Sequence, residues 1–309
     1  MDRAIFATEK RRARGHFRSV VREGAPGERR AAVGDGEFRR SARALRRGHR
    51  FAAAIGDDAG AAASLTSLGI ILQFRGEYDR ALQVHAEALE VRRRTGDGSG
   101  IANSLSNLAS TAFSKNDLDR AAAYADESVV EYRGIGHESG VAHALMILGL
   151  VAACKREYER AEHIFSECLR VQRAVGYTGV TYYSLVNLGA VAHKRGNFDL
   201  ALARYREAFE MLDTMPSKSA IAKTLEDPAF TLASVGDPPR GVRLLGAADA
   251  LRRAIGSPLF ASERADYDAD VARLRALLGD ATFDVQWSLG TSLTIERAIA
   301  DARAAVGGT

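Results

Sequence analysis

The chain has 309 residues and a formal net charge of +4, with 46% hydrophobic and 27% charged residues. These values are ordinary for a globular protein, so they exclude a chain that is disordered throughout. Aromatic residues, at 7%, are too sparse for a large β-sandwich. No proline lies between Pro26 and Pro216, and this stretch is rich in Ala, Leu, Arg and Glu, which predicts a succession of helices.

The sequence shows no targeting signal and no membrane span. Its basic N-terminus is not followed by an apolar core, and the longest apolar run, Ala144 to Cys154, is much shorter than the roughly 20 residues that cross a bilayer. Two cysteines, Cys154 and Cys168, cannot form a framework of disulfides. We therefore expect a reduced, cytoplasmic protein that does not contact a membrane.

Positive charge is concentrated at the N-terminus. Residues 1–50 contain 15 Lys and Arg against 6 Asp and Glu, whereas the rest of the chain is acidic on balance. We predict that residues 1–36 form a basic tail that is disordered or weakly helical. The arginines that could contact nucleic acid or an acidic partner are Arg11, Arg12, Arg14, Arg18, Arg22, Arg29 and Arg30.

A repeat with a period of 40 residues follows the tail. Residues 64–69 align without a gap with 104–109, 144–149 and 184–189, and residues 76–81 align in the same way with 116–121, 156–161 and 196–201. Leu65, Leu68 and Leu72 share one face of a helix, so each unit is predicted to be a pair of amphipathic helices. The sequence thus predicts four repeats over 61–220, preceded at 37–60 by the second helix of a partial first repeat.

Small residues recur where the two helices of a unit have to approach each other. Gly69, Ala109, Gly149 and Gly189 stand in the first helices, and Ala81, Ala121, Ala161 and Ala201 in the second. Gly96, Gly136 and Gly176 are predicted to end the second helices in the left-handed conformation.

Beyond residue 220 the repeat degenerates. Residues 221–257 keep the register at Gly236 but place Pro228 inside the first helix, which predicts a kink or break there. Residues 258–309 are predicted to form a C-terminal helical cap.

The small residue at Gly69, the aromatic residue at Tyr78, and Ala81 and Ala88 resemble the tetratricopeptide repeat. The repeat of that family is usually shorter, and the units here are similar to its longer variant, as in kinesin light chains. The proline that usually closes the repeat is replaced by Arg93, Arg133 and Arg173. The resemblance covers residues 62–221 and implies an all-α, right-handed superhelical solenoid of helix pairs.

A second resemblance covers residues 237–302. The segments Leu244-Leu245-Gly246 and Trp287-Ser288-Leu289-Gly290 are similar to the end of the repeat arm in bacterial signal-transduction ATPases and LuxR-type regulators. The chain contains no Gly-Lys pair, so it has no phosphate-binding loop of the Walker type. The ATPase and DNA-binding functions of those proteins are therefore not carried over, and the chain is interpreted as an independent protein or a detached arm.

Residues of catalytic or metal-binding type are few and scattered. No two of the seven histidines are four residues apart and no Cys-x-x-Cys occurs, so we expect no metal, no cofactor and no catalysis. Cys168 occupies a position held elsewhere by Ala88, Ser128 and Ala208, which favours packing over redox chemistry.

The candidate binding site is the concave groove lined by the first helices. Its predicted residues are polar but almost uncharged, and Asn can pair with the backbone of an extended peptide. They are Ser67, Phe74, Asn103, Ser106, Asn107, Ser110, Phe113, His143, Met146, Tyr183, Asn187, His193 and Lys194. An ordinary solvated groove without a fixed ligand explains the same pattern.

Two functions remain open at this point. The first is a non-catalytic protein-interaction module of a bacterial regulatory system, binding a peptide or partner segment in the groove. The alternative is a nucleic-acid-associated transcriptional regulator that uses the Arg-rich tail. Nucleic acid is not expected on the repeat body, because Lys194 is the only basic residue of the predicted groove.

Overall fold

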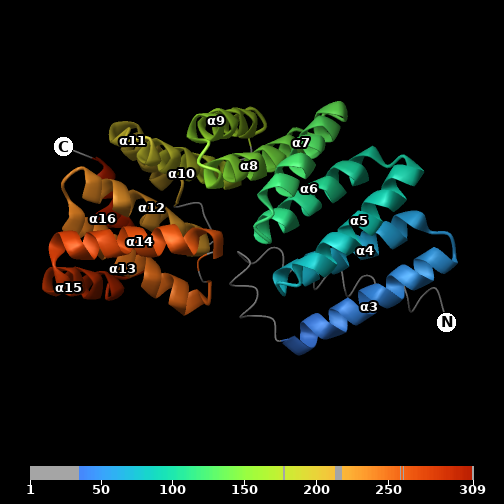
Figure 1. Ribbon diagram of the computed structural model, residues 1–309, viewed down its shortest axis with the longest axis horizontal. Coiled ribbons are helices and arrows are strands. Elements are labelled where there is room, and N and C mark those ends of the chain that lie inside the picture. Colours follow the sequence, from blue (N-terminus) through green and yellow to red (C-terminus); the bar gives the residue numbers. More distant parts are fainter. Residues whose placement is uncertain (1–34, 177, 213–217, 258, 260, 308–309) are drawn as a thin grey trace. The chain divides into compact units, whose positions relative to one another are not determined.

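The computed structural model describes residues 35–176, 178–212, 218–257, 259 and 261–307 (Figure 1). Within these ranges the chain forms 14 α-helices and no strand, which confirms the all-α prediction. The chain divides into two compact units, residues 1–151 and 152–309. Of the predicted basic tail, residues 1–34 lie outside the described ranges, and the first described helix begins at Asp35.

Unit 1 is a series of helices that pack on one another in chain order. They are α3 (Asp35–Ala54), α4 (Asp58–Phe74), α5 (Tyr78–Thr95), α6 (Gly98–Ser114), α7 (Leu118–Gly134) and most of α8 (Glu138–Cys154). The pairs α4–α5 and α6–α7 are the two helices of successive 40-residue repeats. Helix α3 packs on α4, with Ala42 and Leu45 against Leu68 and Leu72, so it stands where the sequence places the second helix of a partial first repeat.

Short turns with fixed backbone geometry set the length of these helices. The Asp57 carboxylate accepts a hydrogen bond from the Gly60 N–H (2.8 Å) and so caps the start of α4. The predicted helix-ending glycines Gly96, Gly136 and Gly176 have φ angles of 70°, 67° and 67°, which confirms their left-handed conformation.

The two helices of the first full repeat touch where the sequence places a small residue. A Cβ atom on Gly69 of α4 would overlap the imidazole ring of His85 on α5. The His85 ring is fully buried, and neither of its nitrogens has a hydrogen-bond partner among the described residues. Ala109 and Ala125 stand at the equivalent positions of the next repeat and are also fully buried. A glycine facing a ring and a pair of alanines are therefore two ways to fill the same space.

Unit 2 continues the pattern and then departs from it. Its helices are α9 (Tyr158–Ala174), α10 (Thr178–Lys194), α11 (Phe198–Glu210), α12 (Lys218–Ser234), α13 (Pro238–Ile255), α14 (Ala261–Leu278), α15 (Asp280–Thr291) and α16 (Ile295–Gly307). Gly189 of α10 faces the ring of Tyr205 on α11, and a Cβ atom there would lie 2.5 Å from Cε1 of that ring. The glycine–ring contact of unit 1 is thus repeated.

Of the predicted kink or break at Pro228, the break does not occur. Helix α12 runs from Lys218 to Ser234 with Pro228 inside it. Pro228 is buried together with Leu225 and Leu232, and α12 packs along α13. This burial offsets the about 3 kcal/mol that a proline costs in a helix interior.

The C-terminal helices are fixed to the last helix pair by close backbone contacts. A Cβ atom on Gly246 of α13 would overlap the carbonyl group of Trp287 on α15, and one on Gly290 of α15 would overlap the carbonyl group of Arg243. Helix α16 is attached by Arg206, whose Nη2 donates to the carbonyl of Val306 (2.7 Å). The second segment with a family resemblance therefore contains the residues of a close helix crossing.

We expect the space between Gly69 and His85 to reverse the sign of one substitution. With His85 present, Gly69→Ala forces the ring out of place and lowers the free energy of unfolding. In a protein that already carries His85→Ala, Gly69→Ala fills part of the cavity that the ring leaves and gains up to about 1 kcal/mol of helix propensity. It therefore raises the free energy of unfolding. Chemical denaturation followed by circular dichroism measures both. An effect of the same sign in the two backgrounds would contradict the contact.

His85 also predicts an acid-sensitive stability. Burial, with the nearby charge of Arg92 as a smaller cause, lowers the pKa of His85 from 6.5 to about 4. The unfolded chain therefore binds a proton that the folded chain does not, and stability falls as the pH falls from about 6.5, levelling off near 4. The loss amounts to about 3 kcal/mol. Phe165 and Tyr205 stand at the position of His85 two and three repeats later, so this position accepts an aromatic ring. His85→Phe removes this part of the pH dependence. Denaturant titrations of both proteins at pH 7 and pH 4.5 test the prediction. An equal loss in both proteins would refute the assignment.

Candidate functional site

The first helices of unit 1 share a face on which polar side chains of neighbouring helices meet. Gln73 of α4 donates from Nε2 to Ser110 Oγ (3.1 Å) and Ser114 Oγ (3.2 Å) of α6. Thr111 Oγ1 donates to Gln73 Oε1 (3.3 Å). Ser106 of α6 shares a hydrogen bond of 2.8 Å with Nδ1 of His143 on α8. We call this the first-helix face of unit 1.

Several predicted groove residues are engaged inside the protein. Ser67 donates to the carbonyl of Ala63 in its own helix (3.0 Å), and Phe74 packs with Leu45 against the core. Ser106 is buried, with 4% of its surface exposed, and Ser110 accepts the bond from Gln73. These four side chains are therefore less available to a ligand than their register predicts.

Other predicted residues remain accessible on this face. Asn103 and His143 are exposed, whereas Asn107, Phe113 and Met146 are half-buried. The side-chain amides of Asn103 and Asn107 form no hydrogen bond with any residue that the structure describes, and both carry donors and an acceptor. The face thus presents two neighbouring amides with free hydrogen-bonding capacity between half-buried apolar side chains.

The predicted groove residues of unit 2 lie on α10, and most have a partner. Asn187 Nδ2 donates to the carbonyl of Tyr183 within the helix (2.8 Å), and Tyr183 is half-buried. Nδ1 of His193 lies 3.0 Å from Oγ1 of Thr231 on α12. Lys194 Nζ forms an ion pair with Asp270 of α14 (3.1 Å).

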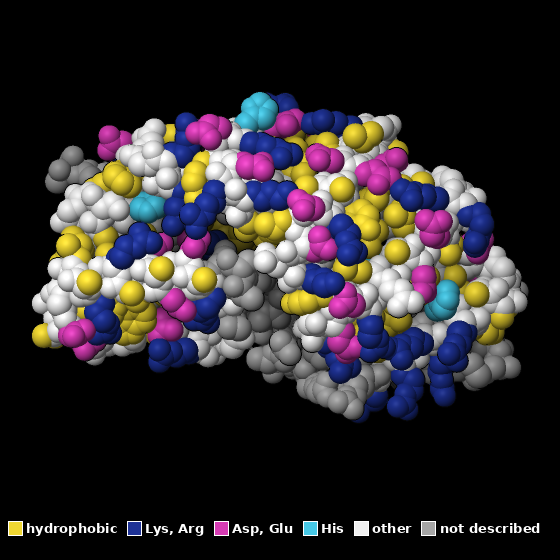
Figure 2. All heavy atoms as spheres, viewed as in Figure 1, with side chains coloured by type: hydrophobic (Ala, Val, Ile, Leu, Met, Phe, Trp, Pro, Cys, Tyr) yellow, Lys and Arg dark blue, Asp and Glu magenta, His cyan; other side chains and the backbone are white. Residues whose placement is uncertain are grey.

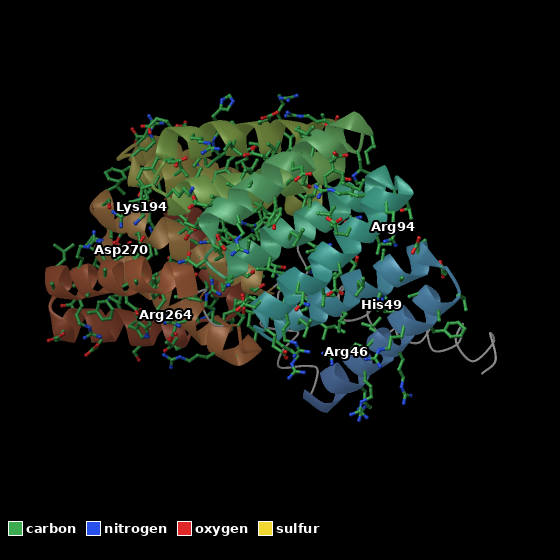
Figure 3. All side chains as sticks on the ribbon, turned by 45° about the vertical axis from the view of Figure 1, so that its right-hand side comes forward. Arg46, His49, Arg94, Lys194, Arg264 and Asp270 are labelled. Atoms are coloured by element: carbon green, nitrogen blue, oxygen red, sulfur yellow. The ribbon has the colours of Figure 1, made fainter. Side chains whose placement is uncertain are left out.

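Helix α14 contacts the first helices of unit 2 from this same side (Figures 1 and 3). Besides the Lys194–Asp270 pair, the ring of Tyr267 meets Phe230 of α12 edge-on, with 5.8 Å between the ring centroids. Much of α14 stays accessible, and Leu274 is the only residue with a described side chain on it that is buried. Helix α14 therefore contacts Lys194, a residue that the sequence assigned to a ligand groove.

A buried ion pair lies beneath α14. Glu226 of α12 is 3% exposed, and its two oxygens accept from Nε and Nη2 of Arg252 on α13 at 2.5 and 2.7 Å. Burial raises the pKa of Glu226, and the bonds from Arg252 oppose this change. A bidentate pair in this position is a structural link between two helices rather than a reactive group, because both charges are satisfied.

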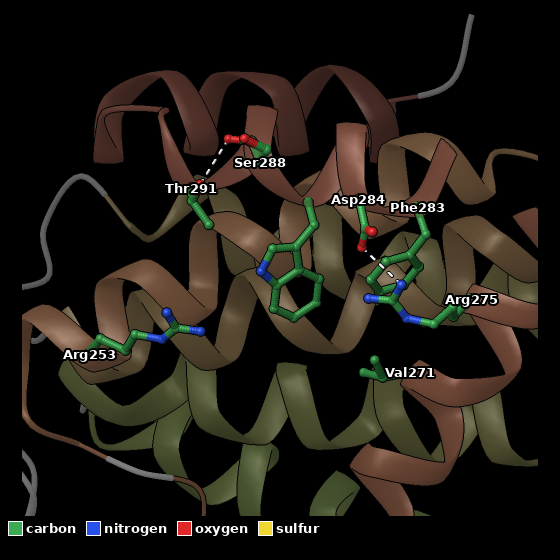
Figure 4. A pocket seen from close by; sticks show the side chains of 8 residues that line it. Arg253, Val271, Arg275, Phe283, Asp284, Ser288 and Thr291 are labelled. Atoms are coloured by element: carbon green, nitrogen blue, oxygen red, sulfur yellow. Dashed lines mark hydrogen bonds and ion pairs between the residues drawn. The ribbon is translucent and has the colours of Figure 1, made fainter. Parts of the chain in front are cut away.

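One pocket of about 410 Å³ opens beside α13, α14 and α15 (Figure 4). The rings of Phe283 and Trp287 stack in it at 5.5 Å, and the guanidinium of Arg275 lies 4.1 Å from the centroid of the Phe283 ring. Arg275 is neutralised by Asp280 and Asp284, at 3.0 and 2.9 Å. Arg253, which also lines the pocket, pairs with Asp249 (2.5 Å), so the pocket offers no unpaired charge that selects a ligand.

The described residues contain no group of three or more metal-ligating side chains. Cys168 is fully buried, accepts a hydrogen bond from Ser184 Oγ (3.4 Å), and has its pKa raised by burial to about 11. This confirms the predicted packing role and gives an unreactive thiol. No described helix is long and apolar enough to span a bilayer.

Comparison with known proteins identifies the repeats. Residues 60–129 and 140–214 match the family model of the tetratricopeptide repeat. The chain is a tetratricopeptide-repeat protein. The family resemblance deduced from Gly69, Tyr78, Ala81 and Ala88 is thereby confirmed.

Solved structures share the fold of this tetratricopeptide-repeat protein at low sequence identity. BtubC from P. vanneervenii has a TM-score of 0.61 and 19% identity, covering 72% of this chain and 93% of that one. A Rap protein complexed with Competence and Sporulation Factor has a TM-score of 0.61 and 12% identity, covering 88% and 72%. The Rap regulator of plasmid pLS20, in complex with the Phr* peptide, has a TM-score of 0.52 and 14% identity, covering 81% and 74%. These likenesses confirm the predicted helical-repeat fold.

Curated relatives match a short part of the tetratricopeptide-repeat chain. Proteins described as HTH-type transcriptional regulators in Mycobacterium bovis and Mycobacterium tuberculosis are 45% identical over 69 residues. The match covers 22% of this chain and 8% of theirs. It therefore spans less than a tenth of their length.

Sequence reasoning missed the residues that link neighbouring repeats. Gln73, Thr111 and Ser114 pair across α4 and α6, and Asp270 pairs with Lys194 across 76 residues of sequence. Thr111 and Ser114 follow Gln73 by about one repeat, and this spacing was a signal that the three side chains lie on neighbouring first helices. Nothing in the 40-residue register points to Asp270.

We expect the packing of α14 against the first helices of unit 2 to depend on Tyr267. Tyr267→Ala removes a half-buried ring and its contact with Phe230, worth about 1–3 kcal/mol, so amide hydrogen exchange in α14 accelerates about tenfold or more. Leu277→Ala on the same helix is the matched control, because Leu277 is 66% exposed. Peptide-resolved exchange measures both proteins. Equal exchange in the two variants would show that the ring does not anchor the helix.

Proposed function

We propose that this protein is a non-catalytic interaction module that binds an extended peptide or partner segment on the first-helix face of unit 1. The observation that supports the proposal is the pair of uncommitted amides at Asn103 and Asn107. An amide side chain donates and accepts at once, so two of them can bind the backbone of an extended peptide whatever its side chains. Phe113 and Met146, both half-buried, offer apolar contacts beside them.

The fold neighbours support a peptide ligand. Two Rap structures that share the fold are complexes, one with Competence and Sporulation Factor and one with the Phr* peptide. The short match to HTH-type transcriptional regulators supports a place in a bacterial regulatory system. The Arg-rich tail of the alternative reading lies outside the described residues and stays a sequence prediction.

The face in unit 1 suits this role better than the predicted groove residues of unit 2. Lys194 and His193 there contact Asp270 and Thr231, so a ligand has to displace existing partners. The side chains of Asn103 and Asn107 have no hydrogen-bond partner among the described residues that a ligand has to displace. Displacing an existing protein hydrogen bond cancels the bond that a ligand forms, whereas an exposed group without a protein partner exchanges water for the ligand and keeps a net gain of about 0.5–1.5 kcal/mol.

A selection from random linear peptides, followed by binding measurements on purified protein, tests the proposal. We expect Asn103→Ala with Asn107→Ala to weaken a selected peptide about tenfold, because two hydrogen bonds contribute roughly 1–2 kcal/mol. Gln83→Ala with Glu87→Ala is the control, since both residues are exposed on α5, away from the first helices. Unchanged affinity in the first variant, with helicity retained, would rule out this face as the site.

A further inference from the structure

The exposed side of α3 carries a row of arginines. Arg40, Arg43, Arg46, Arg47 and Arg50 are all exposed, and each lies three or four residues from at least one of the others. Residues with this spacing share one face of a helix. The opposite face holds Ala42 and Ala52, which are buried. We call the five residues the arginine stripe.

The pictures place this charge at the surface. Figure 2 shows Lys and Arg side chains gathered over the part of unit 1 that α3 occupies, and Figure 3 shows basic side chains of α3, with Arg46 labelled, extending away from the neighbouring helices. None of the five arginines forms an ion pair with a residue that the structure describes.

The repeat provides an internal comparison for this face. At the five positions one, two and three repeats later, the formal charge is −1, −1 and +1, against +5 on α3. These residues are Arg80, Gln83, Ala86, Glu87 and Glu90 on α5; Arg120, Ala123, Asp126, Glu127 and Val130 on α7; and Arg160, His163, Ser166, Glu167 and Arg170 on α9. A second helix of this fold therefore does not need arginine at these positions.

In later repeats the arginine equivalent to Arg40 pairs with an acidic residue three positions earlier, a position that Glu37 holds in the sequence of α3. Arg120 pairs with Asp117 (2.9 Å) and Arg160 with Glu157 (2.8 Å), each one turn earlier in the chain. The other four arginines of the stripe have no acidic residue three positions earlier, and their like charges stand three and four residues apart and repel one another. The stripe thus weakens the isolated helix, and a bound polyanion would remove that penalty.

We propose that the arginine stripe binds the phosphate backbone of duplex nucleic acid. From Arg40 to Arg50 the helix rises about 15 Å, at 1.5 Å per residue. One strand of a duplex presents a phosphate about every 3.4 Å along the axis, so the same length holds four to five phosphates. The guanidinium group binds a phosphate with two parallel hydrogen bonds, which suits arginine rather than lysine for this task.

The side chains between the arginines disfavour two other kinds of partner, an anionic membrane and an acidic protein. A membrane-binding helix inserts large apolar residues, and a protein interface is anchored by aromatic ones. Ala44 is the one exposed apolar residue between Arg43 and Arg46, and no aromatic residue stands between them. With no side chain placed to recognise base edges, the contact is independent of base sequence.

The test compares two variants of the full-length protein that lose the same charge. The stripe variant carries Arg40→Gln, Arg43→Gln, Arg47→Gln and Arg50→Gln. The control variant carries Arg80→Gln, Arg120→Gln, Arg160→Gln and Arg170→Gln, which lie on second helices of later repeats. Both retain residues 1–34, so the arginines of that segment contribute equally to the two variants.

The probe is a fluorescent DNA duplex of arbitrary sequence, titrated by anisotropy at several salt concentrations. We expect the stripe variant to bind at least tenfold more weakly at low salt, and the slope of log K against log salt to fall in magnitude by about three to four. The control variant retains most of the affinity and slope. At low salt, a melting temperature of the stripe variant at or above that of the parent excludes misfolding as the cause.

Two results would overturn the proposal. One is equal binding of the duplex by the stripe and control variants. The other is binding to phosphatidylserine vesicles, or to polyglutamate, with no binding to the duplex. Neither result bears on Asn103 and Asn107, so the proposed peptide site stands or falls separately.

Discussion

The close contact between the two helices of a repeat determines most of what the rest of the chain does. The ring of His85 lies over Gly69, and the ring of Tyr205 over Gly189, with no room for a Cβ atom in either place. Because the ring on the second helix requires a glycine on the first, the sequences of both helices are coupled across 16 residues. A small residue at this position every 40 residues, glycine opposite a ring or Ala109 opposite Ala125, fixes which side of each helix is buried. The residues on the exposed sides of the first and second helices are then free to differ from one repeat to the next.

The register of 40 residues was therefore sufficient to predict the helices, their ends and the small residues at their crossings. It failed at Pro228, because the burial of Leu225 and Leu232 around it holds α12 together. It was also insufficient on the polar face. Whether Ser106 is free or bound depends on His143, which lies on a neighbouring helix 37 residues away. Side-chain pairing of this kind is decided by the stacking of helices, and no pattern within one repeat reports it.

Helix α14 shows the same limitation in a stronger form. The sequence predicts a C-terminal helical cap over residues 258–309 and does not specify where any one helix of it lies. The ion pair between Asp270 and Lys194, and the contact of Tyr267 with Phe230, place α14 beside the first helices of unit 2. A segment after the last repeat can pack in several positions. Tertiary contacts determine which one it takes, such as the crossing of α13 and α15 at Gly246 and Gly290. Those glycines were visible in the sequence, but their partners were not.

First and second helices of unit 1 expose different kinds of side chain, and this difference follows from the contact between the two helices of a repeat. First helices pack against their neighbours through hydroxyl and amide groups, as Gln73 does with Ser110 and Ser114, so a charge there would have to be buried or displaced. Second helices expose one side to solvent and tolerate any charge, as the mixed pattern on α5 and α7 shows. Uncharged amides on the first helices and five arginines on α3 therefore belong to different helices and to different ligand chemistries. Because neither set shares a side chain with the other, a peptide on one does not compete for the groups that contact phosphate on the other.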